Sequence, residues 1–269
     1  TWAPDSDDPM TAERLTAYLI KASREQKGWT TWSAPDIDRE QGLTDYATHL
    51  LTDPDTADEL NAFAALTAKD VSSIILANKA MALTWLGVAD IYQGSELTRT
   101  SLVDPDNRRA VDYDGEGGLR AMLSQVSAGS SPRTLDQEKL RLTHRLAQLR
   151  AERPDTFVGP RSGYRAVPVT TSHAFAYARL LDEEPDVVVI VRRLGRRLRR
   201  LGGWREECVV LPDGQWTELL TEESVDGGAQ RLADVVGDLP VVVLARDRQA
   251  GRADTREDRA EREAGGGTA

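Results

Sequence analysis

The chain has 269 residues, of which 40% are hydrophobic and 29% charged, so it can bury an extensive core and is not disordered as a whole. Its 34 lysines and arginines against 44 aspartates and glutamates give a formal net charge of −10, which argues against nucleic acid or an anionic membrane as a partner. The single cysteine, Cys208, excludes an internal disulfide and fits a reducing cytoplasm. The sequence opens at Thr1 without a signal sequence, and Asn78 and Lys79 interrupt its most apolar helical stretch. We therefore expect a soluble cytoplasmic protein with no membrane span, whose native N-terminus lies elsewhere.

Helical periodicity dominates the first half of the chain. In the first predicted helix, apolar residues recur at i, i+3, i+4 and i+7 from Leu15 to Ala22, and Gly28 ends the pattern. Asp36 follows a proline and is the expected N-cap of the second helix. The predicted helices cover residues 11–27, 36–51, 55–66, 68–85, 119–126 and 135–153.

A strand is expected directly after the fourth of these helices. Gly87 ends that helix, and residues 88–92 have strand composition before Gly94. Helix, glycine, short strand and loop in this order are typical of an α/β unit. We therefore expect the last part of a (β/α)8 TIM barrel with its helices. The connection that follows, residues 95–114, is longer than most loops, which favours a functional role.

The pattern changes at residues 153–154. From Tyr164 onward, short apolar runs separated by glycine, proline and aspartate predict an antiparallel, β-sandwich-like domain. We thus expect the C-terminal part of the barrel with helical insertions over residues 1–153 and a C-terminal β domain over residues 154–246. Residues 247–269 are charged and lack aromatic and large aliphatic residues, which predicts a disordered tail. The predicted strands cover residues 165–169, 174–180, 187–192, 208–211, 216–220 and 241–245.

Several common sites are not indicated by the sequence. His49, His144 and His173 are isolated, and no His-x-x-Glu-His or Cys-x-x-Cys spacing occurs, so we predict no metal. Residues 104–108 begin like a calcium loop, but Arg108 occupies the third acidic position and no glycine follows it. The Gly-Glu-Gly-Gly run at residues 115–118 follows no dinucleotide-binding strand, so no cofactor is expected. The arginine-rich run over residues 192–205 is either an anion-binding patch or a solvated loop, and the net charge favours the loop.

Polar residues gather in residues 87–113, after the expected strand, where barrel enzymes place their substrate sites. Carboxylates and amides accept hydrogen bonds from sugar hydroxyls, guanidinium groups donate in a fork, and aromatic rings cover the apolar sugar face. In the alternative interpretation, Arg108 and Arg109 pair with Asp104 and Asp112 merely to fix the loop, and the two roles are compatible. The candidate substrate-binding residues are Asp90, Tyr92, Gln93, Glu96, Asp104, Asp106, Asn107, Arg108 and Arg109.

Two segments of this region carry a family resemblance. Residues 92–97 read Tyr-Gln-Gly-Ser-Glu-Leu, and residues 101–109 read Ser-Leu-Val-Asp-Pro-Asp-Asn-Arg-Arg. Both resemble signatures of the maltooligosyl trehalose synthases, a branch of the α-amylase family, and weaker likeness extends over residues 1–246. Ala89, Thr98, Arg99 and Ala110 depart from the family pattern. Thr98 and Arg99 replace side chains that are expected to face substrate.

The resemblance implies a reaction and a missing part. It implies that the reducing-end α-1,4 linkage of a maltooligosaccharide is converted to an α,α-1,1 linkage in trehalose biosynthesis, by an intramolecular transglucosylation of the retaining type. The family's catalytic carboxylates follow earlier barrel strands, and none of their motifs occurs here. We therefore expect no catalytic residue in this chain and no activity of the chain alone. Its expected partners are a maltooligosaccharide and the missing N-terminal part of the same enzyme as a second chain.

Two other functions remain open from the sequence. One is that of another glucanotransferase or hydrolase of the α-amylase family, against which the match over residues 101–109 argues. The other is that of a non-catalytic interaction module built from helices and strands.

Overall fold

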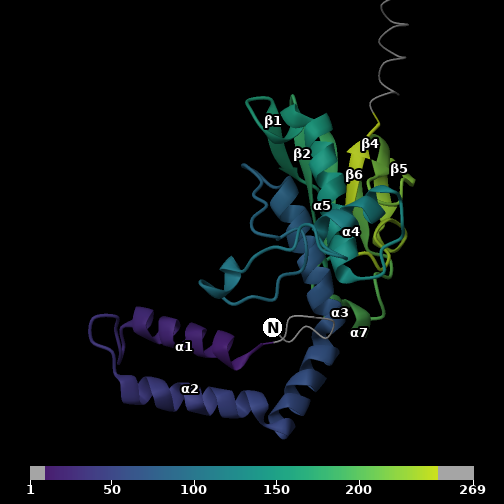
Figure 1. Ribbon diagram of the computed structural model, residues 1–269. Helices are drawn as coiled ribbons and strands as arrows, with labels where there is room; N and C mark the ends of the chain where they lie inside the picture. Colours follow the sequence, from purple (N-terminus) through teal and green to yellow (C-terminus); the bar gives the residue numbers. More distant parts are fainter. Residues whose placement is uncertain (1–9, 248–269) are drawn as a thin grey trace, which may run out of the picture. The chain divides into compact units, whose positions relative to one another are not determined.

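The computed structural model describes residues 10–247, which form two compact units (Figure 1). One unit comprises residues 10–72 and 91–140 and is helical. The other comprises residues 73–90 and 141–247 and contains the β-sheet. The division expected at residues 153–154 stays a prediction. The disordered tail expected over residues 247–269 lies outside the described residues except for Asp247.

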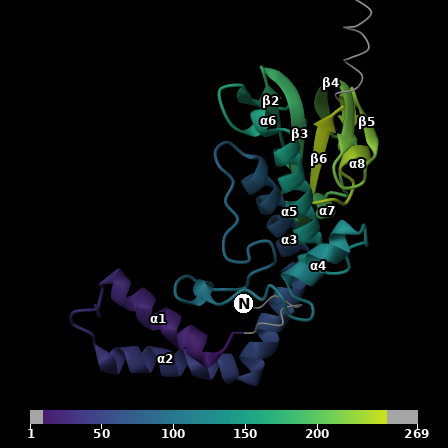
Figure 2. The same ribbon diagram turned by 45° about the horizontal axis from the view of Figure 1, so that its top comes forward.

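The helical unit begins with two helices that lie side by side, α1 (Ala12–Gln26) and α2 (Ile37–Thr52) (Figures 1 and 2). Side-chain oxygens cap both: Thr11 accepts from the Arg14 backbone N–H of α1, and Asp36 accepts from the Arg39 N–H of α2. The later helices α4 (Leu119–Ser127) and α5 (Leu135–Glu152) also lie where the sequence predicted them. The predictions for these four helices are confirmed.

The two helices expected over residues 55–66 and 68–85 form one 31-residue helix, α3 (Pro54–Thr84). The expected break at Thr67 is wrong because no glycine or proline interrupts the backbone there, and the Thr67 hydroxyl donates to the Phe63 carbonyl at 2.9 Å. The helix is buried only in its second half, chiefly at Leu76, Ala80 and Leu83. By length and composition α3 is long and apolar enough to cross a membrane, whereas no membrane span was expected from the sequence, and 17% of its most apolar window is buried.

Residues 88–92 form no strand, so this part of the barrel prediction is wrong. Val88 is 89% exposed and Tyr92 is 59% exposed, so the apolar run has nothing to pack against. A strand of a parallel barrel is hydrogen-bonded and covered on both sides by its neighbours. None of the strands in the described part of the chain is parallel to another, so the run lacks that support.

The sheet of the second unit is antiparallel and has six strands in the order β1-β2-β3-β6-β4-β5. The strands expected at 174–180, 187–192 and 241–245 are confirmed, and those expected at 208–211 and 216–220 form one long strand with an irregularity between Leu211 and Gln215. The strand expected at 165–169 is shifted toward the N-terminus. The strands are β1 (Ser162–Ala166), β2 (Ala174–Leu181), β3 (Glu184–Arg192), β4 (Cys208–Glu218), β5 (Ser224–Arg231) and β6 (Val241–Arg246).

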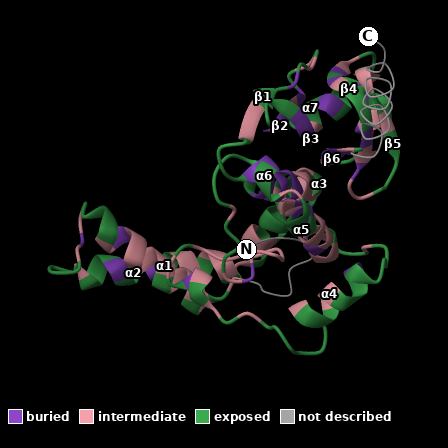
Figure 3. Cartoon of the chain, turned by 90° about the horizontal axis from the view of Figure 1, so that it is seen from above, coloured by how far each residue is buried: buried purple, intermediate pink, exposed green. Residues whose placement is uncertain are grey.

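A single sheet is present where two packed sheets were expected, so the sandwich-like prediction is not confirmed. A bridge between Val169 and Val209 joins the segment after β1 to β4, which draws the two ends of the sheet toward one core. The central strands and β4 supply that core (Figure 3). Trp216 is fully buried in it, and its indole N–H donates to the Pro212 carbonyl at 2.9 Å. Short helices α6 (Pro154–Phe157), α7 (Gly195–Arg200) and α8 (Leu232–Val235) complete the unit.

The arginine-rich run of the sequence divides between two settings. Arg192 belongs to β3, is buried, and donates to the Asp238 carbonyl at 2.7 Å, while residues 196–200 lie on α7. Neither the anion patch nor the solvated loop describes the whole run.

A fully buried arginine on β2, Arg179, joins several chain segments of this unit. Its guanidinium donates only to backbone carbonyls, and burial lowers its pKa. Arg150 of α5 donates to the Leu83 carbonyl at 2.8 Å and so holds the same end of α3. The carbonyls that accept from Arg179 are those of Thr84 (3.1 Å), Trp85 (2.7 Å), Thr156 (3.2 Å), Phe157 (3.1 Å) and Gly163 (3.0 Å).

Candidate functional site

The loop over residues 91–118 is folded around one buried carboxylate, that of Asp106. Arg14 of α1 forms a two-pronged pair with it, with Nε to Oδ1 at 2.8 Å and Nη2 to Oδ2 at 2.9 Å. The Leu102 backbone N–H also donates to Oδ2, at 2.7 Å. The hydrogen bonds from Arg14 hold the pKa of Asp106 below its usual range, and burial opposes them. Asp106 is therefore charged at neutral pH and serves to fold the loop.

Further hydrogen bonds to backbone groups hold the loop in place. Arg14 Nη2 also donates to the Thr100 carbonyl at 2.7 Å, and Arg99 donates to the Arg109 carbonyl at 2.9 Å. Lys139 of α5 donates to the Leu97 carbonyl at 2.6 Å. Because these acceptors are backbone groups, the path of the loop depends on donors from α1 and α5 as well as on Arg99 within the loop.

Of the two predicted site arginines, Arg108 forms the expected pair within the loop, whereas Arg109 binds Asp106 rather than the expected partner. Arg108 pairs with Asp104, which also lies 3.3 Å from Lys21 Nζ of α1. Arg109 Nε donates to the Asp106 carbonyl at 3.1 Å and lies 3.4 Å from its carboxylate. Asp112, the other expected partner, accepts from the Gly115 N–H at 2.8 Å instead and closes a turn.

Gly94 lies at a close approach within the loop. Its φ of +80° is in the left-handed region, which favours glycine. A Cβ there would lie 3.0 Å from Val111 and 3.1 Å from the Arg99 guanidinium. The turn at residues 93–94 therefore needs glycine both for its backbone conformation and for space.

Four of the sequence-predicted site residues have a buried oxygen that accepts no hydrogen bond from the described residues, namely Gln93 Oε1, Glu96 Oε2, Asp104 Oδ1 and Asn107 Oδ1. Asp104 Oδ1 forms an ion pair with Arg108, which leaves the oxygens of Gln93, Glu96 and Asn107. A buried acceptor left without a donor costs about 1–3 kcal/mol, so such atoms are rare unless something else binds them. Tyr92 is exposed, and Asp90 is exposed and groups with the sheet-containing unit. The structure thus brings eight of the nine candidates into one unit and leaves Asp90 outside it.

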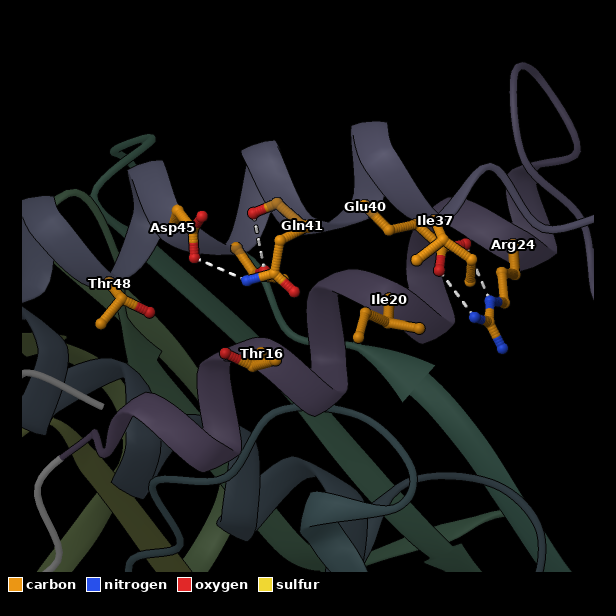
Figure 4. Close-up of a pocket in the computed structure, with 9 residues that line it drawn as sticks. Thr16, Ile20, Arg24, Ile37, Glu40, Gln41, Asp45 and Thr48 are labelled. Carbon is orange, nitrogen blue, oxygen red and sulfur yellow. Dashed lines mark hydrogen bonds and ion pairs between the residues drawn. The ribbon is translucent and has the colours of Figure 1, made fainter.

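A groove with a volume of about 400 Å³ lies between α1 and α2 in the helical unit (Figure 4). Its charged residues are already paired. Arg24 donates to both carboxylate oxygens of Glu40, at 2.8 and 2.6 Å, and Thr30 donates to the same carboxylate. These bonds lower the pKa of Glu40 to about 2. We interpret this trio as a support for the α1–α2 pair rather than as a binding site.

Sequence reasoning missed the residues that hold the loop. Arg14 is 92 positions from Asp106, and nothing in a single sequence links positions so far apart. Arg99, one of the departures from the family pattern, donates to the carbonyls of Asn107 and Arg109 within the loop. Among the residues that the structure describes, no group of three or more histidines, cysteines, aspartates or glutamates is placed to hold a metal ion.

Comparisons with known proteins point to one kind of enzyme, a trehalose-forming synthase acting in carbohydrate metabolism. The chain is 36% identical over 237 residues to proteins of two Mycobacterium tuberculosis strains named putative maltooligosyl trehalose synthase, and this match covers 87% of the chain. It is 29% identical to the solved maltooligosyltrehalose synthase of Arthrobacter ramosus, with a TM-score of 0.75 over 89% of the chain. A solved Sulfolobus tokodaii protein, described as a hypothetical maltooligosyl trehalose synthase, is 25% identical, with a TM-score of 0.64. No family model matches the chain.

The resemblance found in the sequence is therefore confirmed: the chain is similar to the C-terminal part of maltooligosyl trehalose synthase. It spans only 28% of the length of the Mycobacterium relatives and 31% of the Arthrobacter chain. The fold agrees with that part of the solved enzyme as a mixture of helices and an antiparallel sheet.

Proposed function

We propose that the chain supplies the C-terminal part of a cytoplasmic maltooligosyl trehalose synthase. The complete enzyme would convert the reducing-end α-1,4 linkage of a maltooligosaccharide to an α,α-1,1 linkage. The observation that carries this proposal is the match to such enzymes over 87% of the chain, with the signature at residues 101–109 inside it. Because the chain covers 28% of these relatives, the catalytic carboxylates and the rest of the barrel would come from the remaining part, as a second chain or otherwise.

The loop over residues 91–118 would contribute to the sugar site as a preformed wall. Asp106 and Arg14 hold it rigidly, and rigid positioning is what a glycosyl transfer needs in order to keep the released sugar beside the intermediate. Gln93, Glu96 and Asn107 each offer an oxygen with no donor among the described residues. Sugar hydroxyls are suitable donors for these oxygens. We assign Asp106 to loop folding, and Gln93, Glu96 and Asn107 to substrate contact.

The test of this division of roles uses the complete enzyme, formed from this chain and the polypeptide that carries the remaining part of a maltooligosyl trehalose synthase. Asn107→Ala should raise KM for maltopentaose by about tenfold, since one hydrogen bond to a sugar hydroxyl contributes about 1.4 kcal/mol at most. Asp114→Ala is the matched control, because Asp114 is an exposed loop carboxylate paired with Arg120 at the surface. Equal effects of the two substitutions would contradict the assignment.

Product analysis separates the proposal from its alternatives. Trehalose-ended oligosaccharide as the main product supports the proposal. Free glucose or transferred glucan as the main product indicates another enzyme of the α-amylase family, and no product at all indicates an interaction module.

A further inference from the structure

The long helix α3 is apolar on two opposite sides. At about 100° per residue, Leu76, Ala80 and Leu83 share one side, and this side is buried in the sheet-containing unit. The bare face, which we define as Leu60, Phe63, Val71 and Ile74, points about 180° away from it. A helix with apolar residues on both sides is normally covered on both sides.

The described part of the chain covers the bare face only in part. Its four side chains are 38%, 64%, 45% and 57% exposed in chain order. They recur at i, i+3, i+11 and i+14, so they form two apolar pairs on one side of the helix over about four turns, with Thr67 between the pairs. Single exposed apolar residues are common at protein surfaces, but an aligned stripe of large ones marks an interface.

From this arrangement we infer that the bare face of α3 is a docking surface, and that it binds the remaining part of the maltooligosyl trehalose synthase, which this chain does not include. The inference rests on the proposed function. The chain spans 28% and 31% of its relatives, so most of the polypeptide of such an enzyme lies outside it and is available to cover the stripe. A lipid surface is disfavoured, because the opposite side of the same helix packs against protein and the chain carries a net charge of −10.

Leu66 provides a matched control on the same helix. It is 59% exposed, close to the value for Phe63, but it points about 100° away from the middle of the stripe. A glutamate at either position replaces a large, exposed apolar side chain and introduces the same charge. Only the substitution at Phe63 places that charge inside the proposed interface.

Sedimentation velocity measures binding of the full chain to a second polypeptide. This polypeptide is the part of the Mycobacterium tuberculosis relative that lies outside the match with this chain. We expect Phe63→Glu and Val71→Glu to weaken the complex at least tenfold, Leu66→Glu to change it less than twofold, and Phe63→Leu to bind like the unsubstituted chain. Circular dichroism checks that each variant keeps its helix content.

Four results would overturn the inference. The first is that the unsubstituted chain forms no complex, and the second is that Leu66→Glu weakens the complex as much as Phe63→Glu does. The third is that the chain forms a homodimer that Phe63→Glu dissociates. The fourth is that the chain binds phosphatidylcholine vesicles through the same residues. The proposed function is scored separately by incubating the complex with maltopentaose. A complex that depends on the stripe but forms no trehalose-ended product would refute the function alone. Product formation unaffected by the stripe variants would refute the docking surface alone.

Discussion

Replacing Arg179 by methionine tests whether a buried charge without a carboxylate partner holds the sheet-containing unit together. Arg179 is fully buried and donates five hydrogen bonds to backbone carbonyls from the end of α3, from α6 and from β1. Methionine keeps much of the apolar stem but removes every donor. The five carbonyls would then lose the side-chain donor that they share.

The size of the effect follows from the carbonyls that are left without a donor. The Gly163 carbonyl lies opposite Leu180 in the β1–β2 ladder and keeps a backbone donor, so four carbonyls remain. If each of the four costs about 1 kcal/mol, the low end for a buried unsatisfied group, the loss is about 4 kcal/mol. Methionine packing and the relief of burying a charge offset about 1 kcal/mol of this. We therefore expect the free energy of unfolding to fall by about 3 kcal/mol, and by less for Arg179→Lys, because lysine has three donors.

Urea unfolding followed by tryptophan fluorescence measures this change. Arg161→Met is the control, since Arg161 and its partner Asp182 are 51% and 57% exposed, and a surface pair of this kind contributes at most about 1 kcal/mol. A loss below 1 kcal/mol for Arg179→Met, or a loss equal to that of the control, would show that the carbonyls find other donors and would refute the reasoning.

Three further predictions concern the helical unit. The pKa of Glu40 is about 2 in the folded chain and ordinarily 4.5. Its contribution to stability is therefore complete above pH 4.5 and is lost as the pH falls toward 2. The melting temperature of Glu40→Gln should change less over that pH range than the melting temperature of the unsubstituted chain. Asp106→Asn, which removes the carboxylate charge that faces Arg14, should raise the rate of proteolysis within residues 95–114 about tenfold at 25 °C, and an unchanged rate would show that other contacts suffice. In the complete enzyme, Glu96→Ala or Gly94→Val should raise the ratio of free glucose to trehalose-ended product. For Glu96→Ala, turnover should fall less than tenfold, which corresponds to about 1.4 kcal/mol of barrier. A fall of several orders of magnitude at a constant product ratio would instead place Glu96 in the chemical step.

The elements that could be predicted from the sequence are those with a local signal. The helix starts at Thr11 and Asp36 follow from capping residues, and β3 and β6 follow from continuous runs of β-branched residues. β5 was missed because its sequence, Ser-Val-Asp-Gly-Gly-Ala-Gln-Arg, is polar and contains two glycines. It is a strand because β4 offers it a partner along its whole length, and strand pairing is a tertiary effect.

The sequence marks the candidate loop, but the contacts that hold it in place were not predictable. The run at residues 101–109 marks the region, whereas the partners that fix it, Arg14 and Lys139, come from helices far away in the sequence. The expected strand at residues 88–92 failed for a related reason. A parallel strand is stabilised by neighbours on both sides, and residues 10–247 contain none that could pair with it.

The most direct test of the central claim is an activity measurement on this chain alone and in the complete enzyme. Each sample is incubated with maltopentaose, and the products are separated into trehalose-ended oligosaccharide, free glucose and shorter glucans. The account predicts no trehalose-ended product from the chain alone. It predicts trehalose-ended product when the chain is combined with the polypeptide that carries the remaining part of a maltooligosyl trehalose synthase, at a level that the polypeptide does not reach by itself. Trehalose-ended product from the chain alone, or equal activity of the other polypeptide with and without it, would contradict the account.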